Sequence, residues 1–407
     1  MIICAGEVLA DMTQQKHSDG IRFDCHAGGA PFNVACCLAK MGARCGFCGC
    51  VGNDMIGEYL IETARKQHFD YLNMRIDKKR NTTLAFVSVS DSGERKFGFY
   101  RNDTADMYLP LEQTGKIALA ADIVHMGSLP LSSRRGQSFF DKLISGSHRN
   151  GKKVSFDINY RESVFDSFDA ASEIYRKYIQ PADILKFSYD ELQMFAPGSN
   201  DEEKLRFVGG GNKIVFVTMG GDGSMVFADG EIRRESALPV KTVEDTNGAG
   251  DAFMAGALAA LDAGEKDWRK ILRTANACGA LAVGQKGAYP KWDKEQLGGC
   301  DGAVSLRQKS LHTALLVMPK KPRNNKSCNK IIFMHRYGRK KKAVLKPLFL
   351  VFLNERIRQF LSCRSFLRDK IAVSARNRRL LSRSGRAVPD AICLLYRKKS
   401  WHDRRRS

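Results

Sequence analysis

Short apolar stretches that alternate with longer amphipathic ones constrain the fold of this chain more than any other feature. Residues 121–126 and 153–157 are apolar and extended, and residues 133–150 between them follow a helical period. Further apolar stretches follow at residues 182–187 and 213–219. Strand–helix–strand repetition of this kind predicts a mostly parallel sheet with helices on both faces.

Polar and glycine residues follow the predicted strands. The first strand is predicted over residues 1–9, and a polar stretch continues from there to residue 24. Parallel sheets bind ligands outside the carboxyl ends of their strands. The residues at these ends therefore predict one shared crevice, and they are Asp11, Gly127, Asp157 and Ser188.

The run D-T-N-G-A-G-D at residues 245–251 combines a glycine turn with a carboxylate. The residues after it, 252–263, are apolar nearly all round and predict a buried helix, with Gly248 and Gly250 at its N-terminus. Backbone N–H groups at such an end have no intrahelical partner, and the helix dipole favours an anion there. Asp251 would repel a phosphate. It therefore either caps the helix or accepts a proton from a group that attacks the phosphorus.

This complete run resembles the C-terminal signature of the PfkB/ribokinase family of carbohydrate kinases. Residues 28–57 resemble the family's N-terminal signature. The resemblance implies a ribokinase-like α/β domain over residues 1–300, with a central mostly parallel sheet and a small β-sheet lid from about residues 12–25 and 82–104. A β-hairpin is also predicted there directly, because apolar residues alternate on both sides of a turn at Gly93.

Roles for individual residues follow from the same resemblance. The backbone of Gly248, Ala249 and Gly250 is implied to hold the transferred phosphoryl group, and Asp251 to act as the base. Arg161 is implied to neutralise the phosphoryl charge. The implied sugar contacts are Asp11, Gly28, Gly29, Asn33, Arg101 and Arg161. From the residues alone, Asp11 would be a solvated loop carboxylate and Arg101 a surface charge at a hairpin end.

Nucleotide and ion contacts are implied as well. Glu191 is implied to organise water around Mg²⁺. The family usually has Asn where this chain has Ser188, and Ser188 also fits the N-cap of a helix with an acidic first turn. In relatives the loops near Asp245 and Gly287 bind a monovalent cation such as K⁺, and that ion is left open here. The implied nucleotide contacts are Ser188, Thr218, Gly220, Gly223 and Asn276, with Gly287 and Ala288 near the adenine and ribose.

Charge is spread unevenly along the chain. Of its 66 Lys and Arg and 44 Asp and Glu, residues 301–407 hold 29 and 5, which leaves 37 and 39 for residues 1–300. The first 300 residues are therefore near neutral, and the tail alone makes the protein basic. No nucleic-acid-binding module stands out in the tail, and blocks of like charge are usually disordered. A disordered or non-native tail, for example one translated out of frame, is favoured over a nucleic-acid-binding or membrane-surface extension.

Location and partners follow from the remaining features. The N-terminus has no basic stretch typical of a secretory signal, and the longest apolar run of the tail, residues 347–353, is too short to span a bilayer. Twelve scattered cysteines predict free thiols in a reducing cytoplasm. Cys45, Cys48 and Cys50 lack a second pair at zinc-site spacing, so a metal site is disfavoured. We expect a homodimer that binds a sugar and ATP, without membrane or nucleic acid.

The expected reaction is ATP-dependent phosphorylation of a sugar hydroxyl. No G-x-x-x-x-G-K-[ST] is present, which excludes the P-loop version of this chemistry. Residues 97–101 and 105–107 are most similar to the fructokinase branch, so fructose is the first choice of substrate. The alternative is 2-keto-3-deoxygluconate, with Arg101 or Arg161 binding its carboxylate, or another sugar or nucleoside. An alternative of a different class is an inactive kinase-fold binder with a nucleic-acid-binding tail, against which the intact Asp251 argues.

Overall fold

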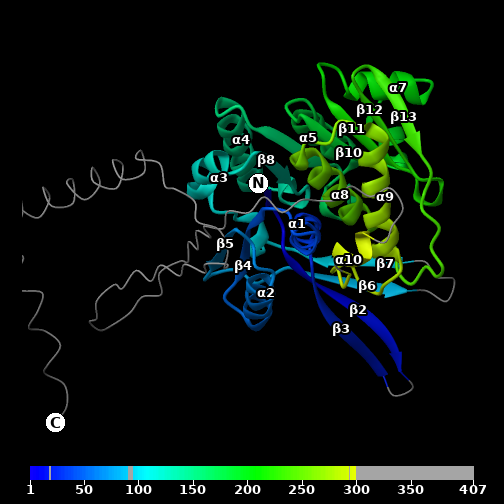
Figure 1. Cartoon of the computed structure of the whole chain (residues 1–407). Coiled ribbons are helices and arrows are strands. Elements are labelled where there is room, and N and C mark those ends of the chain that lie inside the picture. The colour runs from blue at the N-terminus through cyan, green and yellow to red at the C-terminus, as the bar shows by residue number, and fades with distance from the viewer. Residues whose placement is uncertain (18–19, 90–94, 293, 299–407) are drawn as a thin grey trace, which may run out of the picture. The chain divides into compact units, whose positions relative to one another are not determined.

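A computed structural model describes residues 1–17, 20–89, 95–292 and 294–298 of the chain. The predicted basic tail, residues 301–407, lies outside these residues. In the described part, nine strands form one sheet at the centre of the fold (Figure 1). In order across the sheet they are β13 (Glu231–Glu235), β12 (Ser224–Ala228), β11 (Ile214–Thr218), β10 (Ile184–Ser188), β9 (Lys153–Asp157), β8 (Ile123–Met126), β1 (Ile2–Ala5), β4 (Cys45–Gly52) and β5 (Tyr71–Asp77).

The large sheet is parallel from β5 to β11. At its end β12 pairs antiparallel with β11, and β13 pairs antiparallel with β12. The prediction of a mostly parallel sheet is confirmed. β9 has the predicted bounds, whereas the first strand does not. β1 ends at Ala5, and after a break at residues 6–8 the chain enters β2 (Leu9–His17), which belongs to a different sheet. Gly6 and Glu7 interrupt the apolar residues only briefly before Val8 and Leu9, so hydrophobicity alone does not separate two strands here.

Helices cover both faces of the large sheet. One face is packed by α1 (Ala30–Lys40), α2 (Met55–Arg65), α8 (Ala249–Ala263) and α9 (Trp268–Val283), with α10 (Lys294–Gly298) beside α9. The other face is packed by α3 (Thr114–Ala120), α4 (Arg134–Arg149), α5 (Phe168–Ile179), α6 (Tyr189–Phe195) and α7 (Asp201–Val208). Short 3₁₀ turns are η1 (Ala105–Met107), η2 (Leu111–Gln113), η3 (Leu129–Ser132), η4 (Glu162–Val164) and η5 (Gly220–Asp222).

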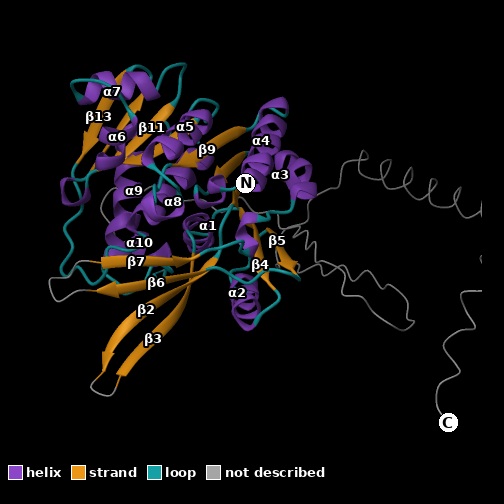
Figure 2. Ribbon diagram, turned by 180° about the vertical axis from the view of Figure 1, so that it is seen from behind, coloured by secondary structure: helices purple, strands orange, loops and turns teal. Residues whose placement is uncertain are grey.

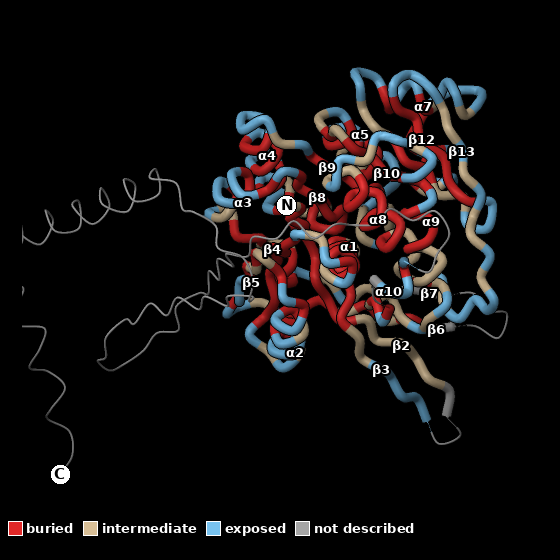
Figure 3. The backbone as a smooth tube through the Cα atoms, in the orientation of Figure 1, coloured by how far each residue is buried: buried red, intermediate tan, exposed pale blue. Residues whose placement is uncertain are grey.

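Side chains of each central strand alternate between two apolar cores. In β1, Ile2 belongs to the core under α1 and α8, whereas Ile3 belongs to the core under α4 and α5. Figure 3 shows the buried residues following the strands and the inner sides of the helices, with exposed residues on the outer turns. The sheet is therefore covered on both faces, as parallel sheets require.

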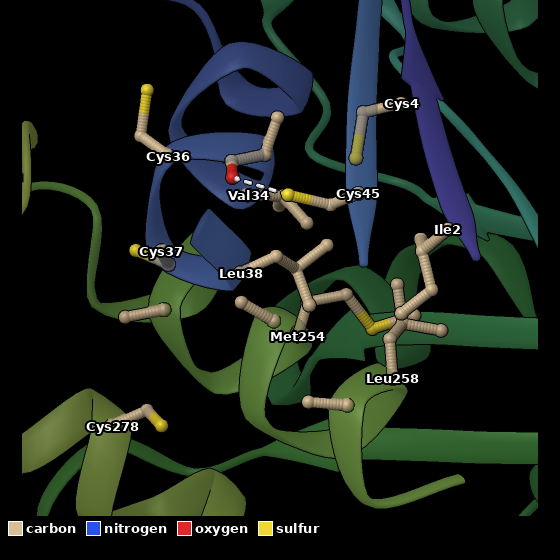
Figure 4. Packing of buried hydrophobic residues seen from close by; sticks show 14 of the residues in the cluster. Ile2, Cys4, Val34, Cys36, Cys37, Leu38, Cys45, Met254, Leu258 and Cys278 are labelled. Atoms are coloured by element: carbon tan, nitrogen blue, oxygen red, sulfur yellow. Dashed lines mark hydrogen bonds between the residues drawn. The ribbon is translucent and has the colours of Figure 1, made fainter. Parts of the chain in front are cut away.

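Buried thiols are part of these cores. Figure 4 shows Cys4, Cys36 and Cys45 among Leu38 and Met254, and these cysteines are free thiols. The predicted strand alternation separates the cysteines of β4. Cys45 faces the α1 core, whereas Cys48 and Cys50 face the opposite core. These three sulfurs therefore do not converge on one metal ion.

A second, four-stranded sheet holds the predicted lid segments. Its strands are β3 (Gly20–Gly28), β2 (Leu9–His17), β6 (Leu84–Val89) and β7 (Arg95–Tyr100), in that order. β6 and β7 form the predicted hairpin. The polar stretch up to residue 24, which belongs to the predicted lid, pairs as the long β2–β3 hairpin. Figure 2 shows this small sheet extending away from the helices below α8 and α9. No helix in the described part of the chain is long and apolar enough to cross a membrane.

Candidate active site

The N-terminus of α8 stands at the centre of the candidate active site. The helix begins at Ala249, three residues earlier than predicted, with Gly248 as its N-cap. Its first intrahelical bond runs from the N–H of Ala252 to the carbonyl of Gly248 (2.8 Å). The Ala249 amide donates to the Thr246 carbonyl (3.4 Å), whereas the amides of Gly250 and Asp251 precede the first intrahelical bond and are available to an anion together with the positive end of the helix dipole.

Asp251 lies in the first turn of α8, buried beside Asn33 of α1. The Asn33 amide Nδ2 donates to Asp251 Oδ2 (2.8 Å). Burial raises the pKa of Asp251, although the Asn33 bond and the positive charges of Lys186 and Arg161 act in the opposite direction. The carboxylate is thus oriented by a fixed amide and sits where it can accept a proton. Asn33 Oδ1 is buried without a protein partner, which leaves one acceptor for a ligand.

A cavity of about 300 Å³ lies in front of Asp251 and is walled by both sheets. It brings together predicted residues from distant parts of the sequence. The predicted residues that line it are Asp11, Gly29, Asn33, Arg161, Ser188, Glu191, Thr218, Gly248, Gly250 and Asp251.

Asp11 reaches this cavity from β2 of the small sheet. Its carboxylate rests on bare backbone, because a Cβ on Gly28 would lie only 2.1 Å from Asp11 Oδ2. Gly28 itself is not among the residues that line the cavity. Burial, reinforced by the charge of Asp251, raises the pKa of Asp11 to about 7. The expectation of a solvated loop carboxylate is therefore wrong.

Lys186 is the most informative residue that the sequence analysis missed. It stands in the middle of β10, with its side chain buried, and lines the cavity. Its ammonium Nζ donates to Asp157 Oδ1 of the neighbouring strand β9 (3.1 Å). Burial lowers the pKa of Lys186, but the carboxylates of Asp157, Glu191 and Asp251 outweigh this effect and raise it. Burial likewise raises the pKa of Asp157, to about 7, against the pull of Lys186. The available signal was a lone lysine inside an apolar strand.

Ser188 and Glu191 form a capping box at the start of α6. The Glu191 amide donates to Ser188 Oγ (3.2 Å), and the Ser188 amide donates to Glu191 Oε2 (2.7 Å). Glu191 Oε1 also accepts from the Tyr160 amide (2.8 Å). The N-cap interpretation of Ser188 is confirmed. No cluster of three acidic, His or Cys residues suited to a metal is present in the described residues.

A second cavity, of about 620 Å³, opens on the other side of the α8 N-terminus. It shares Thr218, Thr246 and Gly250 with the first, so the two cavities meet at the glycine turn. Its walls include the apolar residues Leu238, Val240 and Phe253. The predicted nucleotide residues that line it are Thr218, Gly220, Gly223 and Asn276.

Asn276 lines the second cavity as implied, whereas Ala288 does not. The Asn276 side chain accepts from Ser224 Oγ (2.8 Å) and donates to the Ser236 carbonyl (3.0 Å). It therefore fastens the wall of the second cavity to α9. Ala288 lines the first cavity rather than the second, packed against Gly248.

Arg101 is the predicted site residue that the structure places elsewhere. Its guanidinium is buried, with Nε donating to Asp106 Oδ2 and Nη1 to Ser132 Oγ (2.7 Å each). It is not among the residues that line the first cavity. The surface-charge alternative is wrong, because Asp106 and Ser132 hold the buried guanidinium. Its Nη2 is buried without a protein partner, and Arg101 lines a neighbouring cavity that shares Phe99 with the first, so the substrate contact stays a prediction.

Other cavity residues had no assigned role in the sequence analysis. Phe99 of β7 lines the first cavity, so the aromatic strand does reach it. Glu7 lies in the break after β1, fully buried, and neither of its carboxylate oxygens has a protein partner. The remaining lining residues without an assigned role are Leu9, Ala30, Leu129, Asn159, Thr246 and Asn247.

Comparisons with known proteins agree with this geometry. The family model described as "pfkB family carbohydrate kinase" matches residues 1–295. Fructokinase-2 of Zea mays is 33% identical over 303 residues, covering 71% of this chain and 90% of that protein. The structure of an ATP-bound fructokinase from Xylella fastidiosa is 28% identical with a TM-score of 0.67, over 74% of this chain and 97% of that one.

A further similar structure contains both a sugar and a nucleotide. It is a double-mutant fructokinase from Vibrio cholerae O395 with fructose, ADP and potassium bound. It is 28% identical with a TM-score of 0.64, over 74% of this chain and 97% of that one. Two signatures, two cavities that meet at the α8 glycine turn and a family match across the described domain lead to one conclusion. The chain belongs to the pfkB family of carbohydrate kinases and is an ATP-dependent sugar kinase.

Proposed function

We propose that the chain is a fructokinase, which transfers the γ-phosphoryl group of ATP to a hydroxyl of fructose. The observation that carries the kinase chemistry is the meeting of the two cavities at Gly250, beside the carboxylate of Asp251. The choice of fructose rests on the fructokinase names of its relatives. The placement of Phe99 in the wall of the first cavity is compatible with it.

Asp251 would act as the general base. Its carboxylate would accept the proton of the sugar hydroxyl as the hydroxyl oxygen forms a bond to the γ-phosphorus. The bond from that phosphorus to the β–γ bridging oxygen breaks, and ADP leaves. The amides of residues 249–251 would hold the oxygens of the phosphoryl group, because fixed donors stabilise charge that spreads in the transition state.

The sugar would lie in the first cavity, between the two sheets. Asp11 would accept hydrogen bonds from sugar hydroxyls, and Asn33 Oδ1 offers a further acceptor. Gly29 presents bare backbone on the same wall. Arg161 lines the cavity close to Asp251 and would neutralise phosphoryl charge. The small sheet would cover the sugar and exclude water, so that ATP is not merely hydrolysed.

Five residues would surround the nucleotide. Gly220, Gly223 and Asn276 belong to the wall of the second cavity, Thr218 lies where the two cavities meet, and Ser188 lines the first cavity. Mg²⁺ usually binds substrate phosphates with one or two carboxylates and several waters. The residues present fit this mode. Glu191 lines the cavity, and its two carboxylate oxygens accept hydrogen bonds from the backbone amides of Tyr160 and Ser188. Glu191 would therefore hold the ion through water. When bound, the ion would supply positive charge to the β- and γ-phosphates.

A monovalent cation such as K⁺ is proposed for the loops at Asp245 and Gly287. Asp245 Oδ1 accepts from the Asn247 amide (2.7 Å) and Oδ2 from the Gly287 amide (3.0 Å), so one carboxylate joins the two loops. The similar V. cholerae structure contains potassium.

We also propose a homodimer in the reducing cytoplasm. The small sheet exposes Ile21, Phe23 and Tyr100, and apolar side chains gathered on one sheet are suited to a second copy. The free buried thiols fit a reducing compartment.

The runner-up substrate is 2-keto-3-deoxygluconate, which Arg161 favours because its guanidinium could bind a carboxylate in the same cavity. ADP release should be measured with MgATP against fructose, ribose, 2-keto-3-deoxygluconate, tagatose and inosine. We expect the highest kcat/KM for fructose. A higher kcat/KM for the sugar acid would replace fructose by the runner-up, and silence towards all five would contradict the proposal.

A further inference from the structure

We propose that Lys186 is a catalytic residue whose ammonium contacts the phosphoryl group during transfer, and that Asp157 is the positioning residue that aims it. This proposal rests on the kinase function proposed above. Neither residue has an assigned role in the chemistry described so far.

The ammonium of Lys186 lies directly on the anion-binding turn. A Cβ built on Gly250 would be 2.9 Å from Lys186 Nζ, with no other atom of the protein as close. Gly250 is flanked by Ala249 and Asp251, whose amides are proposed to hold the phosphoryl oxygens. A side chain at this position would have to push the ammonium aside. The turn and the lysine therefore form one positively charged surface facing the cavity.

A purely structural role does not account for this lysine. Lys186 is flanked on β10 by apolar residues and is 6% exposed, in the centre of the large sheet. Replacing a buried ion pair by apolar residues is often neutral or stabilising, so fold stability alone does not require one. The pair is also incompletely satisfied, because Asp157 Oδ2 has no protein partner.

The surrounding charges fit a group that waits for an anion. Asp157, Glu191 and Asp251 all act on Lys186 and keep it protonated. The 3.1 Å bond to Asp157 Oδ1 uses one of its three N–H donors. The other two can reach phosphoryl oxygens over Gly250. In a cavity from which water is excluded, such a charge stabilises the transition state more strongly than it would in water.

The proposed step moves no proton to or from Lys186. The sugar hydroxyl proton goes to Asp251, the phosphorus exchanges its bond to the ADP oxygen for one to the sugar oxygen, and the ammonium only donates hydrogen bonds. A P-loop lysine serves a comparable purpose in other kinases, and this chain has no P-loop. Lys186 would supply the missing positive charge from a β-strand.

The test compares Lys186→Met with the wild type in the full chain. We expect kcat to fall about 10²–10³-fold, the range seen when one transition-state donor is removed, while the KM for the sugar changes less than about threefold. Lys186→Gln serves as a second variant that retains hydrogen bonding if the Met variant folds poorly. Lys177→Met is the matched control, because Lys177 of α5 forms an exposed ion pair with Asp141 of α4 (2.9 Å). A kcat within threefold of wild type in Lys186→Gln or Lys186→Met would overturn the proposal.

Two further readouts separate catalysis from structure. Lys186 lowers the pKa of Asp251, so its removal should move the acid limb of the kcat–pH profile to higher pH. Asp157→Asn should reduce kcat by about tenfold in the wild type and by much less in the Lys186→Met background, since coupled residues are not additive. Independent, additive losses with an unshifted pH profile would count against the proposal.

A failure of the proposed sugar kinase function is distinguishable. If the wild type releases no ADP with any sugar, that function fails, and nucleotide binding then decides the role of Lys186. Calorimetric titration should show that Lys186→Met weakens binding of a non-hydrolysable ATP analogue at least tenfold and leaves adenosine binding unchanged. Equal affinity of the variant and the wild type for the analogue would then overturn the proposal.

Discussion

At the scale of single residues, the protonation state of Glu7 is the most specific prediction. Its carboxyl group is fully buried, packed against the α-carbon of Gly127, and both oxygens lack protein partners. Burial raises the pKa of Glu7 to about 8, although the backbone amide of Glu7 itself and the charge of Arg101 act in the opposite direction; the charges of Asp106 and Asp251 raise it further. Glu7 is therefore a neutral acid at pH 7 in the folded protein. In the unfolded chain it loses its proton near its ordinary pKa.

The sign of the resulting pH dependence is fixed by proton binding. Between the unfolded and folded pKa values of Glu7 the folded state holds one more proton, so stability falls as pH rises through this window. Glu7→Gln removes the titration while keeping the shape. We expect the variant to gain on the order of 2–4 kcal/mol relative to wild type between pH 5 and pH 8, at about 1.36 kcal/mol per pKa unit.

Thermal or chemical unfolding at several pH values measures this difference. Glu173→Gln on the exposed side of α5 is the control and should show no pH-dependent difference from the wild type. A constant difference between Glu7→Gln and the wild type across the range would show that Glu7 is ionised in the fold.

At the scale of elements, the end of β7 is fixed to the main domain by a buried ion pair. The Arg101 and Asp106 side chains are 3% and 1% exposed. Asp106 Oδ1 also accepts hydrogen bonds from Thr83 and Thr104 Oγ1. Asp106→Ala would leave a guanidinium buried without its charge partner. We expect a loss of about 3–5 kcal/mol of unfolding free energy, as for other broken buried pairs.

The nearby exposed pair of Arg80 and Asp103 provides the matched control for chemical unfolding. Asp103 is 62% exposed but has a positive φ (50°), so Asp103→Ala should cost no more than about 1–2 kcal/mol, part of it from the strained backbone. The double variant Arg101→Met/Asp106→Leu should recover much of the loss, because it removes both charges together. Equal effects of Asp106→Ala and Asp103→Ala would refute the anchoring role of the pair.

Elements with clear periodicity were predictable from the sequence, and those defined by distant contacts were not. β9 has its predicted bounds, and α4 differs from its prediction by only one residue at each end. Polar caps and turns mark the ends of both elements, which made them predictable. The end of β1 was wrong because apolar residues resume at Val8, directly after Gly6 and Glu7, and continue into the small sheet. The partner of Arg101 was missed because a hairpin pattern does not show which carboxylate meets its end.

At the scale of the whole molecule, the motif residues were predictable and the charges behind them were not. Asp251 and Asn33 are recognisable in their motifs, although they are 218 positions apart when they meet. The proposed role of Lys186 depends on its contacts with Asp157 on the next strand and Gly250 at the start of α8. No local sequence pattern links these three residues. The described elements end at residue 298, and the family match ends at residue 295.

Sugar-dependent ADP release by Asp251→Asn tests the central claim most directly. It should be measured in the full chain and in a chain ended after residue 300, alongside binding of a non-hydrolysable ATP analogue. We expect both wild-type lengths to be active. Asp251→Asn should retain analogue binding and lose about 10²–10⁴-fold in kcat, because the general base is gone. Near-normal turnover by Asp251→Asn would contradict the account.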